Sequence, residues 1–121
     1  MLGWKVFGSG LQGLAVQAIC QDAGTALTAS GTAQGDALEL VNESSDVTTV
    51  ASGSGVVLSS KLSSGDSQYV FNAGANPLKV YPPVGFKINS LTTNGPMILS
   101  INTGCIFKCM SSTRVMGVLS A

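Results

Sequence analysis

The residues best able to do chemistry in this chain are two pairs of acids. Asp36 with Glu39, and Glu43 with Asp46, are the acids that stand closest together in the sequence. Two neighbouring carboxyl groups could serve as a general acid and a general base. Both pairs lie in polar, turn-like sequence, where carboxylates are normally solvated, and the chain has no histidine, the commonest general base. We therefore predict no catalytic residue and no enzymatic activity.

The cysteines do not have the spacing of a metal site. Cys105 and Cys109 stand too far apart for a zinc knuckle and have no partner pair. On one strand they would share a face roughly 13 Å apart, which is farther than a disulfide spans. We predict that Cys105, Phe107 and Cys109 are buried apolar residues of a protein made in a reducing compartment, with no metal and no cofactor.

A glycine-rich stretch near the N-terminus has the spacing of a nucleotide-binding loop. Gly8 to Gly13 reads G-x-G-x-x-G and follows a possible strand at residues 4–7. In a dinucleotide-binding fold such glycines let the backbone approach a pyrophosphate. The rest of that unit is missing, because Thr28 and Ala29 stand where an acid is needed and no crossover helix and parallel strand follow. We therefore predict no nucleotide site.

Residues 1–23 have two interpretations. The first is an arm that docks on a neighbouring subunit, because glycines weaken a self-contained strand or helix and Trp4 and Phe7 are costly to leave in water. The partner-binding residues of this arm would be Leu2, Trp4, Val6, Phe7 and Leu11. The alternative is a short strand and helix of the domain's own core, since apolar residues from Leu11 to Ile19 have helical spacing.

From Leu38 onward the sequence mostly has a strand period of two, with a turn signal about every ten residues. Leu38 and Leu40 flank Glu39, for example, and Asn102-Thr103-Gly104 separates two apolar runs. Short strands with such turns are typical of β-sandwiches and barrels. We predict one all-β domain over residues 24–121, a small antiparallel β-sandwich or barrel that follows the N-terminal arm.

The clearest strand–turn–strand pattern lies between Tyr69 and Tyr81. A β-rich run ends at Phe71, turn formers fill residues 72–77, and two prolines at 82 and 83 end strand pairing. This pattern predicts a hairpin. Its second strand should place Leu78 and Val80 in the core, with Lys79 and Tyr81 on the opposite face.

The same run resembles a segment of many bacteriophage virion proteins, in which V-x-N-A-G-A-N-P-L-x-V-Y-P precedes x-I-N-G. The matching residues are Val70 to Pro82 and Ile88-Asn89, and a weaker likeness covers residues 37–121. The chain departs from the pattern at Ser90, where the family usually has glycine, and near Val115-Met116, where an aromatic residue is common.

Proteins with this segment are small all-β parts of phage particles, among them trimeric cement or decoration proteins of the head. The resemblance implies a homotrimeric capsid cement protein that binds the major capsid protein on the virion surface and is assembled in the host cytoplasm. The alternative is a host-recognition or carbohydrate-binding module of a head or tail fibre. Such a module needs exposed aromatic rings, and Trp4, Tyr69 and Tyr81 are the few candidates besides the phenylalanines.

Charge is scarce and unevenly placed along the chain. Charged residues make up 10% of the sequence and the formal net charge is zero, against about 25% charged residues in an ordinary domain. Such a surface tends to self-associate. All six acids stand at or before Asp66 and four of the six bases after it, which gives the halves −4 and +4. This asymmetry either serves packing between subunits or vanishes if strands of the two halves interleave.

Two partner classes are not expected from the sequence. No stretch reaches the roughly 18 apolar residues that a membrane span needs. The four bases after Asp66 are dispersed and form no basic cluster, so we predict no nucleic-acid binding.

Overall fold

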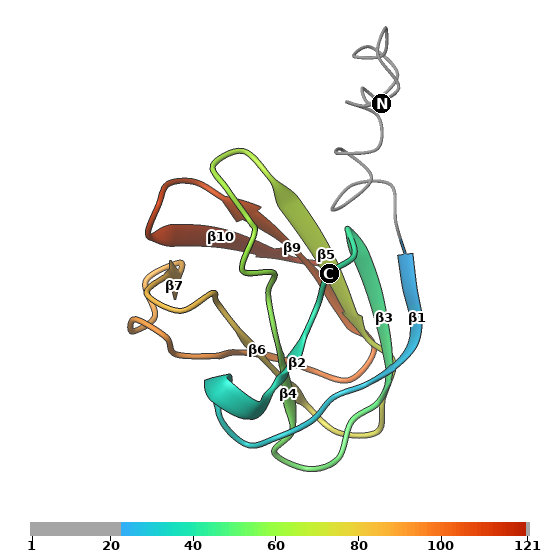
Figure 1. Ribbon diagram of the computed structural model, residues 1–121. Helices are drawn as coiled ribbons and strands as arrows, with labels where there is room; N and C mark the ends of the chain where they lie inside the picture. The colour runs from blue at the N-terminus through green and yellow to red at the C-terminus, as the bar shows by residue number, and fades with distance from the viewer. Residues whose placement is uncertain (1–22, 121) are drawn as a thin grey trace, which may run out of the picture.

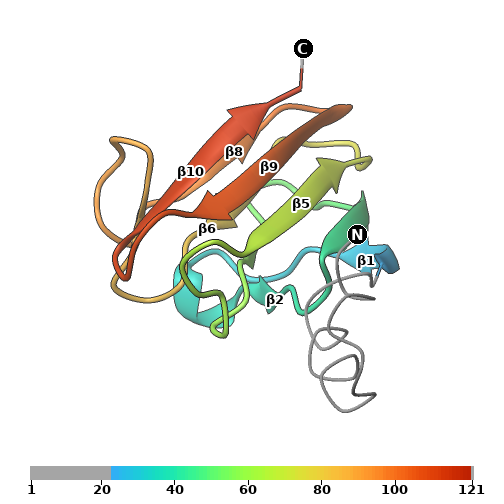
Figure 2. The ribbon, with the colours of Figure 1, turned by 90° about the horizontal axis from the view of Figure 1, so that it is seen from above.

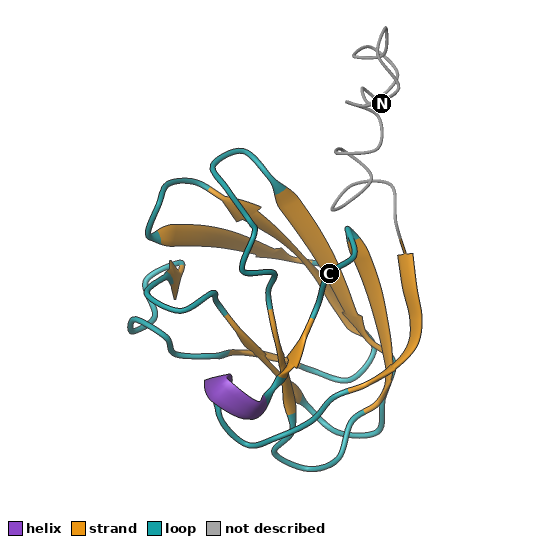
Figure 3. Cartoon of the chain, viewed as in Figure 1, coloured by secondary structure: helices purple, strands orange, loops and turns teal. Residues whose placement is uncertain are grey.

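The computed structural model describes residues 23–120, and in this range the chain forms ten strands in two sheets (Figures 1 and 3). The all-β class is therefore confirmed. The six-stranded sheet has the order β1 (Ala23–Thr28), β3 (Ser44–Thr49), β5 (Ser67–Asn72), β9 (Thr103–Cys109), β10 (Arg114–Leu119) and β7 (Lys87–Ile88). The four-stranded sheet has the order β2 (Leu38–Glu39), β4 (Gly55–Val57), β6 (Leu78–Tyr81) and β8 (Met97–Leu99), and the short 3-10 helix η2 (Gln34–Asp36) precedes β2.

Successive strands from β1 to β6 alternate between the two sheets. Within each sheet these strands pair in parallel, so the first half of the domain is a coil that lays one strand in each sheet per turn. Strands β8, β9 and β10 then close the domain with antiparallel pairs. The arrangement is solenoid-like, and the predicted antiparallel sandwich or barrel is wrong. The turn signals were real, but from β1 to β6 the turns carry the chain across to the other sheet.

The predicted hairpin at residues 69–81 is wrong for the same reason. Its two strands are β5 and β6, which belong to different sheets, so residues 72–77 form an arch between the sheets. Asn72 is fully buried at the start of this arch. Its Nδ2 donates to the carbonyl oxygens of Asn76 at 2.9 Å and Leu99 at 3.0 Å, and its Oδ1 accepts the N–H of Gly74 at 2.9 Å. This side chain therefore satisfies backbone groups of the arch and of β8 that would otherwise be buried without a partner.

The arch also packs closely on the residue that follows β3. A Cβ atom on Gly74 would lie 2.5 Å from Cγ2 of Val50, so only glycine fits there. Asn76 Nδ2 donates to the carbonyl oxygen of Val50 at 2.8 Å. The asparagines and the glycine of the N-A-G-A-N run are therefore accounted for by the geometry of the arch.

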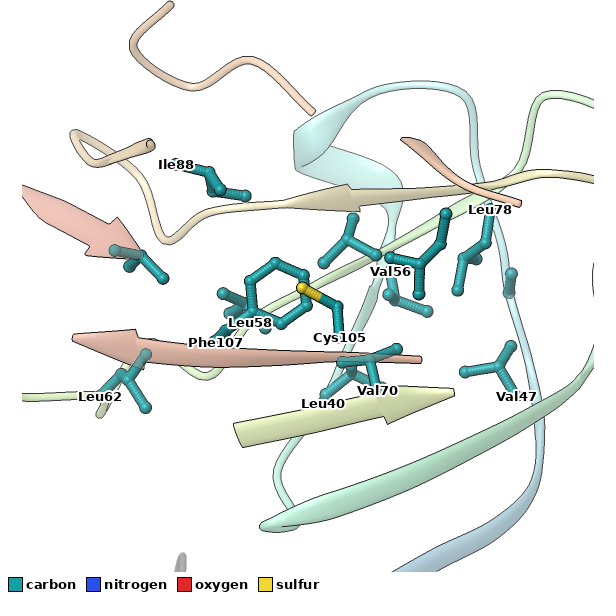
Figure 4. Packing of buried hydrophobic residues seen from close by; sticks show 14 of the residues in the cluster. Leu40, Val47, Val56, Leu58, Leu62, Val70, Leu78, Ile88, Cys105 and Phe107 are labelled. Carbon is teal, nitrogen blue, oxygen red and sulfur yellow. The ribbon is translucent and has the colours of Figure 1, made fainter. Parts of the chain in front are cut away.

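The core lies between the two sheets, as the close-up in Figure 4 shows. Leu78 and Val80 are fully buried in it, which confirms the predicted register of β6. Lys79 is partly exposed on the opposite face. Tyr81 shares that face but is buried, because the chain before η2 covers it and its hydroxyl donates to the carbonyl oxygen of Thr32 at 3.2 Å.

The inward side of β9 matches its prediction. Cys105, Phe107 and Cys109 are all buried, with 0%, 0% and 1% of their surfaces exposed, and both thiols are free. Burial raises the pKa of the Cys105 thiol to about 11, because the thiolate would lose its hydration. These cysteines are therefore inert, neutral core residues.

Strand β5 is fixed at both of its ends by buried amides. At the start of the strand Gln68 is 1% exposed. Its Nε2 donates to the carbonyl oxygen of Leu40 at 2.9 Å, and its Oε1 accepts the N–H of Ser59 at 2.8 Å. Asn72 holds the other end. The orientation of the residues between them, Tyr69 to Phe71, is thereby set.

The two edges of the six-stranded sheet are irregular. At one edge, β1 shifts register against β3 around Ala26, which has a φ of 54°. At the other edge, β7 contributes only Lys87 and Ile88 to the pairing with β10. The strands between these edges, β3, β5, β9 and β10, pair regularly. They form most of the outer face of the six-stranded sheet.

Candidate interaction surface

The outer face of the six-stranded sheet carries large apolar side chains. Figure 2 shows β5, β9 and β10 side by side in front of the four-stranded sheet. Ile106, Met116 and Val118 point outward from these strands and are 50%, 40% and 53% exposed. Tyr69 and Phe71 point outward from β5 and are half-buried. We call these five residues the apolar face.

The register brings the apolar face together as one surface. Tyr69 stands opposite Ile106, and Ile106 stands opposite Val118, so three apolar side chains form a row across β5, β9 and β10. A Cβ atom on Gly104 would clash with the hydroxyl of Tyr69, so the Tyr69 side chain lies over the bare backbone of Gly104. Contiguous exposed apolar surface of this kind marks interaction sites.

A shallow hollow of about 210 Å³ extends the apolar face toward β1. It lies over the short side chain of Ser44 on β3, with Thr25 of β1 on one side and the rings of Tyr69 and Phe71 on the other. Its exposed lining is almost entirely apolar. Ala23, the first described residue, also lines it, so the preceding chain enters the domain at the rim of this hollow.

The sheet order keeps the charges of the two halves of the chain apart. In both sheets the strands that precede Asp66 lie together on one side, and those that follow it lie on the other. The strands of the two halves therefore do not interleave. On the outer face, Asp46 of β3 is exposed on one side, and Lys108 of β9 and Arg114 of β10 are exposed on the other. The apolar face thus has an acidic margin and a basic margin.

The first acid pair is engaged in holding loops. Asp36 Oδ1 accepts the backbone N–H groups of Thr32 at 3.1 Å and Ala33 at 2.9 Å. Glu39 Oε2 accepts both the N–H and the hydroxyl of Ser60, each at 3.0 Å. Because the two carboxylates bind different loops, this pair is explained by local structure.

The described residues, 23–120, contain neither a cluster suited to a metal ion nor a membrane-spanning helix. Within that range no group of three or more cysteine, aspartate or glutamate residues gathers in a way that could hold a metal ion. The same part of the chain contains no helix long and apolar enough to cross a membrane.

The site residues predicted from the sequence, Leu2, Trp4, Val6, Phe7 and Leu11, lie outside the described residues, as does the glycine-rich stretch. Sequence reasoning missed the apolar face itself. Its signal was present in β9 and β10, where Ile106, Met116 and Val118 occupy alternate positions that a solvated strand would give to polar residues.

Comparisons with known proteins found no relative of this chain. No family model, no curated protein and no solved structure matched this chain.

Proposed function

We propose that this chain is a structural subunit that assembles with other subunits through its apolar face. The row of Tyr69, Ile106 and Val118 carries the proposal, because Ile106 and Val118 are exposed and Tyr69 is half-buried beside them, on a chain with very few charges. Removing such side chains from water contributes roughly 25 cal/mol per Å² of apolar surface, which offsets part of the entropy that association costs. The acidic and basic margins would orient one copy against the next.

Within that class we propose a capsid cement protein of a bacteriophage, a homotrimer bound to the major capsid protein on the virion surface. This finer proposal rests on the resemblance of residues 70–82 to phage virion proteins. The asparagines and the glycine of that motif hold the arch, so a shared motif implies a shared arch. The capsid partner and assembly in the host cytoplasm come from the resemblance alone.

The N-terminal segment belongs to the same proposal. Leu2, Trp4, Val6, Phe7 and Leu11 dock on a neighbouring subunit or on the capsid shell. The segment joins the domain at Ala23, beside the apolar face. A structural role of this kind needs no catalytic residue.

A carbohydrate-binding module of a head or tail fibre is the second candidate. The rings of Tyr69 and Phe71 beside the hollow favour it, since aromatic rings stack on sugars. The almost wholly apolar lining of the hollow favours a protein partner instead, because sugar hydroxyls need hydrogen bonds. Binding of the purified chain to a glycan array would support this candidate.

The mass of the full-length chain in solution tests the proposed assembly. Light scattering at micromolar concentration should report a trimer, three times the 12.2 kDa of one chain. A mass of one chain at that concentration would overturn the proposal. Electron microscopy of the particle that contains the chain would then place it on the head or elsewhere.

A further inference from the structure

We infer that the N-terminal residues 2–7 of one copy cover the apolar face of the adjacent copy, with Trp4 seated in the hollow beside Tyr69 and Phe71. The inference rests on the proposed assembly and names the occupant of its surface. It would make the contact between copies an exchange of arms, repeated from one copy to the next.

The N-terminal segment leaves its domain beside the hollow and is long enough to reach an adjacent copy. Ala23 lines the hollow, so the segment leaves its own domain at the edge of the outer face. Eighteen residues lie between Trp4 and Ala23, and extended chain spans about 60 Å over that length at roughly 3.3 Å per residue. Five strands of a sheet are only about 20 Å wide at roughly 4.8 Å per strand. The segment is therefore long enough to leave one copy and cross the face of the next.

The chemistry of the segment matches the surface. Leu2, Trp4 and Val6 alternate, so an extended segment would turn all three to one side. That apolar side fits a hollow whose lining is almost entirely apolar. Lys5 falls on the other side of such a segment, away from the hollow, so the match between the segment and this surface is an apolar one.

The charge margins favour an adjacent copy over the chain's own face. Strand β1, from which the segment leaves, lies on the acidic side of the sheet, and β10 lies on the basic side. Head-to-tail copies would bring the acidic side of one against the basic side of the next, so the segment would first meet Val118 and Ile106 of its neighbour. A repeated contact of this heterologous kind forms a ring where the rotation from copy to copy closes, as it does in a trimer, and an open filament where it does not.

Trp4 is the sole tryptophan, so its fluorescence reports on the contact. In the unmutated full chain its emission should be blue-shifted and protected from acrylamide. The double variant Ile106→Lys/Val118→Glu places opposite charges at a directly facing pair, which the sheet tolerates. That variant should shift the emission to the red and expose Trp4 to the quencher while its circular dichroism stays unchanged. The matched control Ile98→Lys alters a residue of β8 that is 51% exposed on the other sheet, and it should change neither reading.

Mixing two variants decides which copy supplies the segment. The Leu2→Ser/Trp4→Ser chain has an intact face and no tryptophan, and the Ile106→Lys/Val118→Glu chain has an intact segment and a broken face. Mixing them should restore the blue-shifted emission. A solvent-exposed Trp4 in the unmutated trimer would overturn the inference and leave the proposed assembly standing. Failure of the mixture to restore the emission would also overturn it, and a monomer in light scattering would overturn the assembly itself.

Discussion

The inner and outer faces of the six-stranded sheet come from the same strands and similar residue types, yet only the inner face is covered. Along β9, Cys105 and Phe107 are fully buried, whereas Ile106 between them is 50% exposed. An antiparallel strand that faces water on one side normally carries polar residues there. The alternation of residues along a strand therefore identifies which side chains share a face of the sheet. The residue types on the outward face then indicate whether water or another protein covers that face.

The largest expected effect compares an inward with an outward residue of the four-stranded sheet. Leu78→Ala should lower the free energy of unfolding by about 2–5 kcal/mol, because it leaves a cavity in the core. Ile98→Ala, on the strand paired with β6, should change it by less than about 0.5 kcal/mol. Urea unfolding of both variants measures the difference. Equal losses would mean that the two faces are not distinct.

The second prediction tests whether the buried polar contacts of the arch matter as much as apolar packing. Asn72→Ala should lower the free energy of unfolding by about 2–4 kcal/mol, since it leaves the N–H of Gly74 and the carbonyl of Leu99 without their partner. Thr48→Ala, on the exposed side of β3, is the control and should be nearly neutral. A loss as small as that of the control would show that water replaces the amide and that the arch is open.

The smallest expected effect uses pH to probe how well the inner face is sealed. The folded protein keeps the Cys105 thiol protonated up to its raised pKa of about 11, whereas the unfolded chain releases that proton near the ordinary value of 9.0. Stability should therefore fall between these values as pH rises, by at most about 1.4 kcal/mol per pH unit for this thiol. Urea unfolding of wild type and Cys105→Ala at pH 8 to 10.5 measures the slopes. Cys109, whose pKa burial also raises, contributes to both slopes. Identical slopes would show that Cys105 is accessible to solvent.

Local alternation was predictable, and the pairing between distant strands was not. The period of two placed Leu78 and Val80 in the core and predicted the burial of Cys105 and Phe107 correctly. Turn residues indicate where a strand ends but not which sheet the chain enters next, so the arch after Asn72 was taken for a hairpin. Parallel pairing depends on partners far apart in sequence, such as Ser44 and Tyr69.

The local sequences of β1 and of the start of β3 did not predict a strand. Ser44 to Asp46 were expected to lie in a polar turn, yet they form the start of β3 because β1 and β5 pair with them on both sides. Ala23–Thr28, which contains a glycine and two alanines, was not expected as a strand and becomes β1 by pairing with β3. Tertiary context overrides weak β-propensity in both cases.

The candidate surface was predictable only in part. The low charge content indicated association, and the apolar residues of β9 and β10 were visible in the sequence. The row of Tyr69, Ile106 and Val118 needed the register of three strands, of which β5 is remote in sequence from the other two. The hollow needed β1, which the sequence did not predict.

The irregular edges of the six-stranded sheet limit how far copies can grow into fibres. Coils with parallel strands expose backbone N–H and carbonyl groups at both ends, and regular ends would let copies add strand to strand without limit. The left-handed conformation of Ala26 breaks that ladder in β1, and the two residues of β7 are too few to template another strand. These two edges therefore resist the addition of strand to strand, and any contact between copies at this sheet would be made by the side chains of its outer face.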